Sequence, residues 1–191
     1  MKPNYLTILI TTLCIFFNAC HNSNTAPQLQ LADSLIDKRA DSALCILEKL
    51  SIEEISNKSA KAMYALLLTE ALDKNFKSHR NDSLILIAVD YYKDNSNNKL
   101  KTKAYYYLGR VYQDNKEYIK ATEAYLTALK TASPNQAPIL QIYNNLALCY
   151  ESQEFYLPAI KTYKESYATA EKMQGKYGTL HATRGLANLY A

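Results

Sequence analysis

Apolar residues recur with a helical period in the stretch 105–128. Tyr105, Leu108 and Tyr112 are three or four positions apart and therefore share one face of a helix. After a polar turn a second series with the same spacing begins, and its members are Tyr118, Ala121, Tyr125 and Ala128. This pattern predicts a helical hairpin in which the small residues Gly109 and Ala121 face each other where the two helices approach closely.

The same order of residues returns further along the chain. A second copy lies 38 positions later, in Tyr143, Leu146, Ala147, Tyr150, Ala159 and Tyr163. A third copy begins another 40 positions on, with Leu186, Ala187 and Tyr190, and is expected to be truncated after its leading helix. Because a single amphipathic hairpin is common and a repeated one in fixed register is not, residues 99–191 are predicted to form two complete repeats and the start of a third.

These residues resemble the signature of the tetratricopeptide repeat (TPR), which runs aromatic-x2-Leu-Gly-x2-Tyr and then Ala-x3-aromatic. The 17 tyrosines and the absence of tryptophan fit a signature in which tyrosine fills the aromatic positions. The resemblance implies an all-α fold, an α-solenoid of stacked antiparallel helix-turn-helix hairpins. Such hairpins must stack, because none of them buries its apolar face alone.

Residues 29–98 carry weaker helical patterns that are interpreted as divergent TPR-like hairpins. Two short helices are expected in 29–50, followed by a polar linker over 51–57. A longer helix is expected over 59–74 and its partner over 82–92, with Asp82 or Ser83 as the helix cap. Polar residues 93–98 then form a turn before the first clear repeat.

The first 19 residues resemble a bacterial export signal rather than part of the fold. One lysine precedes an apolar stretch over residues 5–17, which is shorter than the roughly 20 residues that a membrane span needs. Ala19-Cys20 then resembles a lipobox, in which Cys20 would be acylated, although Phe17 departs from the usual leucine. Simple cleavage near Ala19 and an uncleaved anchor are the alternatives. With acylation, residues 20–28 would be a flexible, lipid-anchored tether.

The remaining cysteines and the charge add no further site. Cys45 and Cys149 are flanked by apolar residues and are expected to be small buried thiols rather than a disulfide. No Cys/His spacing suits a metal, and no cofactor is expected. The net charge of +4 is made of interspersed residues of both signs, so the chain has no basic patch that would indicate nucleic acid.

Catalytic signatures are also missing from the sequence. His21, His79 and His181 are far apart, and the chain contains no HExxH, G-x-S-x-G or glycine-rich phosphate loop. Glu53 and Glu54 lie in the polar linker and are expected to be solvated. We therefore expect a protein that is not an enzyme and has no small-molecule substrate.

The resemblance to TPR proteins places a ligand-binding surface in the concave groove lined by the leading helices. Carried over position by position, this surface comprises Lys103, Tyr106, Tyr107, Arg110, Gln113, Gln141, Asn144, Asn145, Leu148, Glu151, His181, Arg184, Gly185 and Asn188. Only one of the five positions that form a carboxylate clamp in some TPR co-chaperones is matched, by Asn145. The amide and cationic groups beside tyrosine rings suit an extended peptide with some acidic character, and Arg110 is expected to contribute most.

The sequence as a whole resembles the envelope TPR lipoproteins of Bacteroidetes-type bacteria. It predicts a non-catalytic protein-interaction scaffold, exported and lipid-anchored in the cell envelope, at the outer membrane on its periplasmic or surface side. Its partner would be a protein or an extended peptide. Two alternatives are the periplasmic input portion of a larger signalling or transcription-regulatory protein, and a cell-wall or glycan-associated assembly lipoprotein.

Overall fold

The structure is a computed structural model that describes residues 25–78, 81–133, 138–173 and 176–190. The described part of the chain consists of helices joined by turns. Their bounds are α2 Ala26–Leu35, α3 Ala40–Leu47, α4 Lys58–Lys74, α5 Ser83–Tyr92, α6 Asn98–Asp114, α7 Tyr118–Thr131, α8 Ile139–Ser152, α9 Tyr156–Lys172 and α10 Lys176–Tyr190. None of these helices is both long and apolar enough to cross a membrane.

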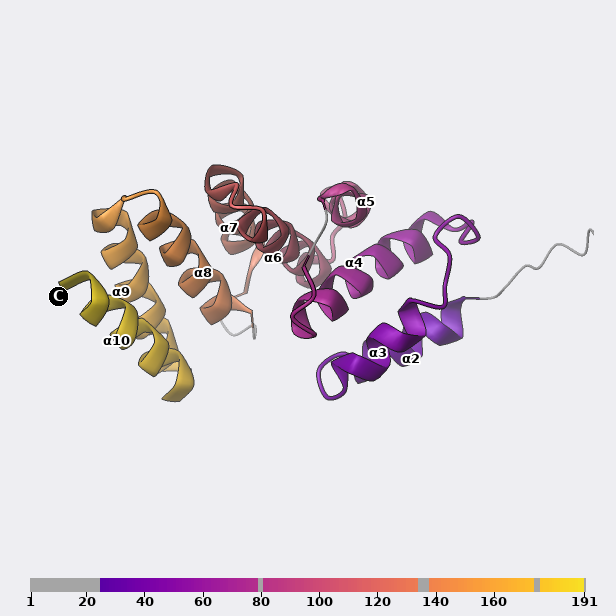
Figure 1. Cartoon of the computed structure of the whole chain (residues 1–191), viewed down its shortest axis with the longest axis horizontal. Coiled ribbons are helices and arrows are strands. Elements are labelled where there is room, and N and C mark those ends of the chain that lie inside the picture. Colours follow the sequence, from indigo (N-terminus) through magenta and orange to yellow (C-terminus); the bar gives the residue numbers. More distant parts are fainter. Residues whose placement is uncertain (1–24, 79–80, 134–137, 174–175, 191) are drawn as a thin grey trace, which may run out of the picture.

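Successive helices pair into antiparallel hairpins that follow one another along a curved row (Figure 1). The hairpins are α2–α3, α4–α5, α6–α7 and α8–α9, and α10 packs against α9. Each leading helix also contacts the next leading helix, from α2 through α4, α6 and α8 to α10, whereas the trailing helices α5, α7 and α9 do not touch one another. The leading helices therefore line the concave side, as the TPR resemblance implies.

Identical turns end the leading helices of three hairpins. Phe76, Lys116 and Glu154 each adopt a left-handed backbone, with φ of 55°, 61° and 61°. The next residue in each case donates its backbone N–H to a carbonyl five positions back, with N–O distances of 3.0, 2.8 and 2.8 Å. This Schellman-type end satisfies carbonyls that the helix leaves unpaired. The hairpin at 58–92, which has the weaker sequence pattern, therefore ends its leading helix in the same way as the two clear repeats.

Apolar faces of neighbouring hairpins form an elongated core. One cluster joins α2 and α3 to α4, a second joins α4 and α5 to α6, and a third joins α7 to α8. Tyr125 is the largest fully buried side chain, and its hydroxyl donates to Gln113 Oε1 at 2.7 Å. The hydrogen bond satisfies the one polar atom that this ring brings into the core.

An aromatic ring lies against the glycine of the first clear repeat. Gly109 faces the ring of Tyr125, and a Cβ added to Gly109 would lie 2.4 Å from Tyr125 Cε1. Ala121 is fully buried in the same hairpin. The nearest atoms to the added Cβ all belong to the Tyr125 ring, so the glycine makes room for this ring. The direct pairing of Gly109 with Ala121 stays a prediction.

Several predicted boundaries change by a few residues. Helix α2 begins at Ala26, so the last three residues of the expected tether are helical. Asp82 is the N-cap of α5 by position, but its side chain makes no capping bond, and Asn81 Oδ1 accepts from the N–H of Ser83 instead. Residues 1–24, including Cys20, His21 and Cys14, lie outside the described residues.

The two cysteines that the structure describes are both free thiols. Cys149 is buried as predicted, and burial raises the pKa of its thiol to about 12. Cys45 is exposed, so the prediction that it is buried is wrong. It lies on α3 between the buried Leu44 and the half-buried Ile46, where helical rotation turns it outward.

Candidate functional site: a groove along the leading helices

Two adjoining pockets form a groove on the concave side. One has a volume of about 770 Å³ and is lined by α2, α4, α6 and the start of α8. The other has a volume of about 830 Å³ and is lined by the starts of α2, α4 and α6 and by the end of α5. Met63, Asn97 and Leu100 line both pockets, so the two spaces adjoin and share part of their walls.

The first of these, which we call the charged pocket, has acidic and basic walls. Its charged lining residues are Asp33, Asp37, Glu70, Asp73, Lys74, Lys99 and Lys103. Glu70 is only 2% exposed and lies between two ammonium groups, with Lys74 Nζ 3.1 Å from Oε1 and Lys103 against Oε2. A buried carboxylate of this kind is tolerated because both of its oxygens have cationic partners.

Arg110 lies beside this pocket and is also paired. Its Nε donates to Asp73 Oδ1 at 2.8 Å, and its Nη1 donates to Gln113 Oε1 at 3.3 Å. Burial alone would lower the pKa of Arg110, but the Asp73 carboxylate together with neighbouring groups such as Asp114 outweighs burial and raises it. The guanidinium is therefore charged and neutralised within the fold.

This pairing changes the expectation for the ligand. Lys103 and Arg110, the two basic groove residues predicted in the first clear repeat, both have acidic partners from α4. An acidic peptide would have to displace Glu70 or Asp73 to reach them, at the cost of leaving a carboxylate in a partly buried site without its partner. This pairing reduces the charge that Lys103 and Arg110 offer to a ligand. The preference for acidic peptides and the dominance of Arg110 stay predictions.

The predicted groove residues divide into three groups in the structure. Lys103, Tyr106, Tyr107 and Gln141 line the charged pocket. Others are engaged in internal hydrogen bonds: Gln113 with Tyr125, Asn144 with Ser166 at 2.9 Å and Asn145 with Tyr106 at 3.4 Å. Leu148, His181, Arg184 and Asn188 are exposed, Glu151 is half-buried, and Gly185 is buried under the ring of Tyr163.

Two tyrosines of the pocket wall are held by burial. Tyr107 is 4% exposed, and burial together with the nearby Glu70 raises the pKa of its phenol well above the usual value. Burial, aided by Asp73, raises the pKa of Tyr106 to about 12. Both phenols are therefore neutral at physiological pH, and Tyr107 contributes to the core more than to an accessible surface.

Sequence reasoning missed the contribution of α2, α4 and the end of α5 to the groove. Glu70, Asp73 and Lys74 lie within about one turn of α4, whose sequence pattern is otherwise largely apolar. Charged residues inside an apolar pattern could have been predicted to lie at a functional surface or in ion pairs. Among the described residues no group of three or more His, Cys, Asp and Glu side chains is arranged to hold a metal ion.

Comparisons with known proteins agree with this architecture. Residues 101–172, which cover almost all of α6 through α9, match the tetratricopeptide repeat family. A solved structure described as a putative kinesin light chain with nearly identical TPR-like repeats, from Podosopora anserina, superposes with a TM-score of 0.64 at 18% sequence identity. The similarity covers 89% of this chain and 87% of that chain.

A search of curated proteins finds no match. At 18% identity, the structural similarity establishes the arrangement of helices and nothing about partners. The chain is an all-helical, TPR-like solenoid whose residues 101–172 match the tetratricopeptide repeat.

Proposed function

We propose that the protein is a non-catalytic interaction scaffold that binds an extended peptide of a partner protein in the groove along α2, α4, α6 and α8, and that Cys20 anchors it by acylation in a bacterial envelope. The observation that carries the proposal is that two pockets with shared wall residues lie side by side along the leading helices. Together they give an open path of exposed and half-buried side chains from four successive hairpins, which suits a chain-like ligand better than a compact one.

The lining of the groove also supports binding rather than catalysis. Tyrosine rings, amides and paired charges can hold a peptide by contact and hydrogen bonding. The described residues that line the two pockets include no histidine and no cysteine. The hydroxyl groups of the lining serines and threonine therefore have no histidine beside them that could act as a general base. TPR repeats are generally protein-interaction scaffolds, and the match over residues 101–172 supports the same role here.

Site-specific photo-crosslinking tests the groove. A photoreactive phenylalanine replaces Lys99 or Gln141, two exposed residues of the charged pocket, in the full chain expressed in its own cells. Glu123 and Lys164, exposed on the trailing helices α7 and α9, serve as controls. We expect one and the same partner to crosslink from both groove positions and from neither control. Crosslinking of a partner only from the trailing helices would rule out the groove.

Anchoring is tested separately through Cys20, which lies outside the described residues. Cys20→Ala should abolish labelling by a clickable fatty acid and release the protein from the membrane fraction, because several acyl chains are what hold a lipoprotein stably. Cys45→Ala is the matched control and should leave labelling unchanged. Labelling that persists in Cys20→Ala would reject acylation at this residue.

A further inference from the structure

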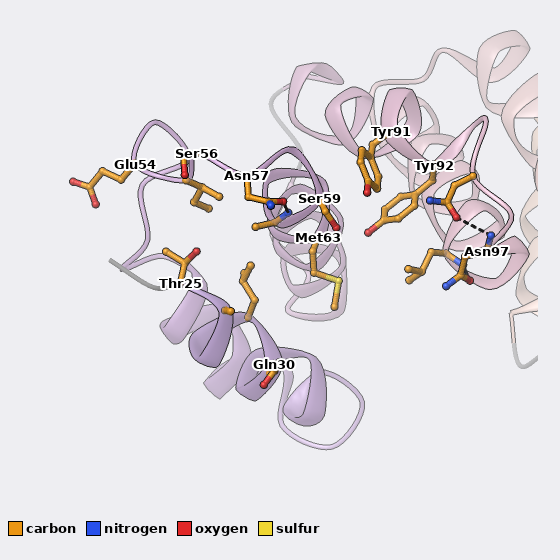
Figure 2. A pocket seen from close by; sticks show the side chains of 16 residues that line it. Thr25, Gln30, Glu54, Ser56, Asn57, Ser59, Met63, Tyr91, Tyr92 and Asn97 are labelled. Carbon is orange, nitrogen blue, oxygen red and sulfur yellow. Dashed lines mark hydrogen bonds between the residues drawn. The ribbon is translucent and has the colours of Figure 1, made fainter. Parts of the chain in front are cut away.

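The second pocket of the groove, which we call the uncharged pocket, differs in chemistry from the charged one. It lies where α2, α4 and α6 begin and α5 ends (Figure 2). Its lining contains no lysine, arginine or histidine, and its one acid is Glu54. The carboxylate of Glu54 points away from the other labelled side chains (Figure 2), so the interior offers amides, hydroxyls and apolar groups.

Two hydroxyls at the wall of this pocket make no hydrogen bond to a described residue. Tyr92 is 4% exposed and Thr25 is 8% exposed, and both line the pocket. Neither hydroxyl makes a hydrogen bond to any described residue, and Thr25 does not cap α2 although it occupies the N-cap position. Each hydroxyl oxygen is accessible from the pocket, so it can bond to water or to a ligand that enters.

Amide side chains of the pocket are already oriented by the fold. Asn57 Oδ1 accepts from the N–H of Ala60 and Asn97 Oδ1 accepts from the N–H of Leu100, both at 3.1 Å, as helix caps. Asn95 Oδ1 accepts from the N–H of Asn97 at 2.8 Å. In all three residues the carbonyl oxygen is used internally while the NH2 group remains a donor. The pocket therefore presents donors and suits a ligand rich in acceptors.

Apolar side chains complete the wall. Leu29, Ile55, Met63 and Leu100 line the same space as the ring of Tyr91, which is packed edge-on against Tyr92 with ring centroids 5.1 Å apart. Methionine adapts its shape to different partners, and tyrosine offers a rigid ring with a polar tip. A large apolar side chain flanked by main-chain carbonyls fits this combination of an aliphatic wall and amide donors.

Resting on the proposed function, we infer that the uncharged pocket binds an uncharged stretch of the partner peptide, with its main-chain carbonyls on the amides of Asn57, Asn95 and Asn97 and the hydroxyl of Tyr92, and one apolar side chain against Met63 and Tyr91. A peptide is favoured over a sugar because the charged pocket adjoins this one, with Met63, Asn97 and Leu100 in the walls of both, and an extended chain could contact the two together. The aliphatic wall also suits an apolar side chain better than a hydroxylated ring.

Selection from a phage-displayed library of random dodecapeptides on the full chain tests this inference. We expect the selected sequences to share a large apolar residue within an uncharged segment. Tyr92→Phe removes a hydroxyl that has no internal partner, so it should leave the melting temperature unchanged while raising the Kd of a selected synthetic peptide about fivefold.

A second variant blocks the space itself. Ser59 is exposed and lines the pocket, so Ser59→Trp should fold normally and raise the same Kd by more than about tenfold. Glu123→Ala on α7 is the control and should bind as the wild type does. The same variants are also tested for binding to an array of uncharged oligosaccharides.

The outcomes separate this inference from the proposed function. One outcome is that selected peptides bind normally to Tyr92→Phe and Ser59→Trp but lose affinity when Lys99 or Gln141 is substituted. That result would overturn peptide binding in the uncharged pocket and leave the proposed binding of a peptide in the rest of the groove intact. Binding of oligosaccharides, but of no peptide, that is lost in Ser59→Trp would make the pocket a glycan site. If no peptide binds and no partner crosslinks from the groove, both the inference about the uncharged pocket and the proposed function of the groove are rejected.

Discussion

Tyr125 and Tyr163 occupy equivalent positions in successive repeats, and each ring lies against a glycine of a leading helix. Tyr125 covers Gly109 of its own hairpin, and Tyr163 covers Gly185 of the helix that follows. An added Cβ would come within 2.4 and 2.3 Å of the respective rings, closer than any normal contact. Glycine is needed at both positions for close approach, although it weakens the interior of a helix.

Substitution of Gly109 by alanine should therefore destabilise the protein. Alanine favours the helix by about 1 kcal/mol, but Tyr125 is fully buried and hydrogen-bonded and cannot move aside freely. Overpacking typically costs about 1–3 kcal/mol, so we expect a lower midpoint in urea unfolding. Ala121→Leu, at another fully buried site of the hairpin, should be destabilising, whereas Ala187→Leu on the exposed face of α10 should not. An unchanged midpoint for Gly109→Ala would contradict the packing of this ring.

At the scale of the element, the hairpins are built on one recurring turn. Phe76, Lys116 and Glu154 take a left-handed backbone that glycine adopts without strain and other residues do not. Phe76 is the most unusual of them, because its bulky side chain is also 98% exposed. The hydrogen bonds that close each turn determine this conformation, so the strain is a local cost of ending the helix sharply.

Glycine at such a position should stabilise the protein. Glu154→Gly relieves a left-handed strain of about 1–2 kcal/mol, partly offset by the greater freedom that glycine gives the unfolded chain. We expect a net gain of several tenths of a kcal/mol, seen as a higher melting temperature by circular dichroism. Glu154→Ala keeps the strain and is the matched control. A melting temperature that falls for the glycine variant and not for alanine would contradict this account of the turn.

At the scale of the whole molecule, ion pairs join the first hairpin to the rest of the solenoid. Asp37, in the turn between α2 and α3, pairs with Lys74 at the end of α4. Glu48, the residue that follows α3, pairs with Lys77, whose Nζ lies 3.0 Å from Glu48 Oε1. Glu70 and Asp73 extend the connection to Lys103 and Arg110 on α6. Because the charged pocket lies among these groups, its shape depends on their pairing.

Acid should weaken the first of these connections. The hydrogen bond from Lys74 lowers the pKa of Asp37 below its ordinary value of 3.8. A lowered pKa in the folded state means that the contribution to stability is present above the unfolded pKa and is lost as the pH falls through the folded pKa. The stability difference between wild type and Asp37→Asn, expected to be about 0.2–1 kcal/mol for an exposed pair, should be present at pH 7. It should begin to fall near the ordinary pKa of Asp37 and vanish once the pH is below the lowered pKa of the folded state.

Urea unfolding of both proteins from pH 7 to acid measures this difference. Asp94→Asn, at an exposed aspartate without an ion pair to a described residue, is the control and should follow the wild type. A difference that grows on acidification would show that the Asp37 carboxylate does not stabilise the fold.

Local pattern predicted the helices well, and the reason is physical. Helical periodicity depends only on residues three or four positions apart. The spacing of Tyr105, Leu108 and Tyr112 therefore predicts a helix regardless of which residues pack against it in the fold. The predicted helices at 59–74 and 82–92 begin and end within one residue of α4 and α5. The TPR signature added the pairing of helices into hairpins and the concave side formed by leading helices.

By itself, then, the sequence determined the all-helical repeat and which helices face the groove, because both follow from local spacing and a repeated signature. Only the tertiary structure decided how the groove is charged. Asp73 neutralises Arg110 from 37 positions away, and no local pattern relates the two residues. The uncharged pocket likewise joins the ends of four helices, from Thr25 to Leu100. Partners of side chains are set by which helices pack together, and that is a property of the folded chain alone.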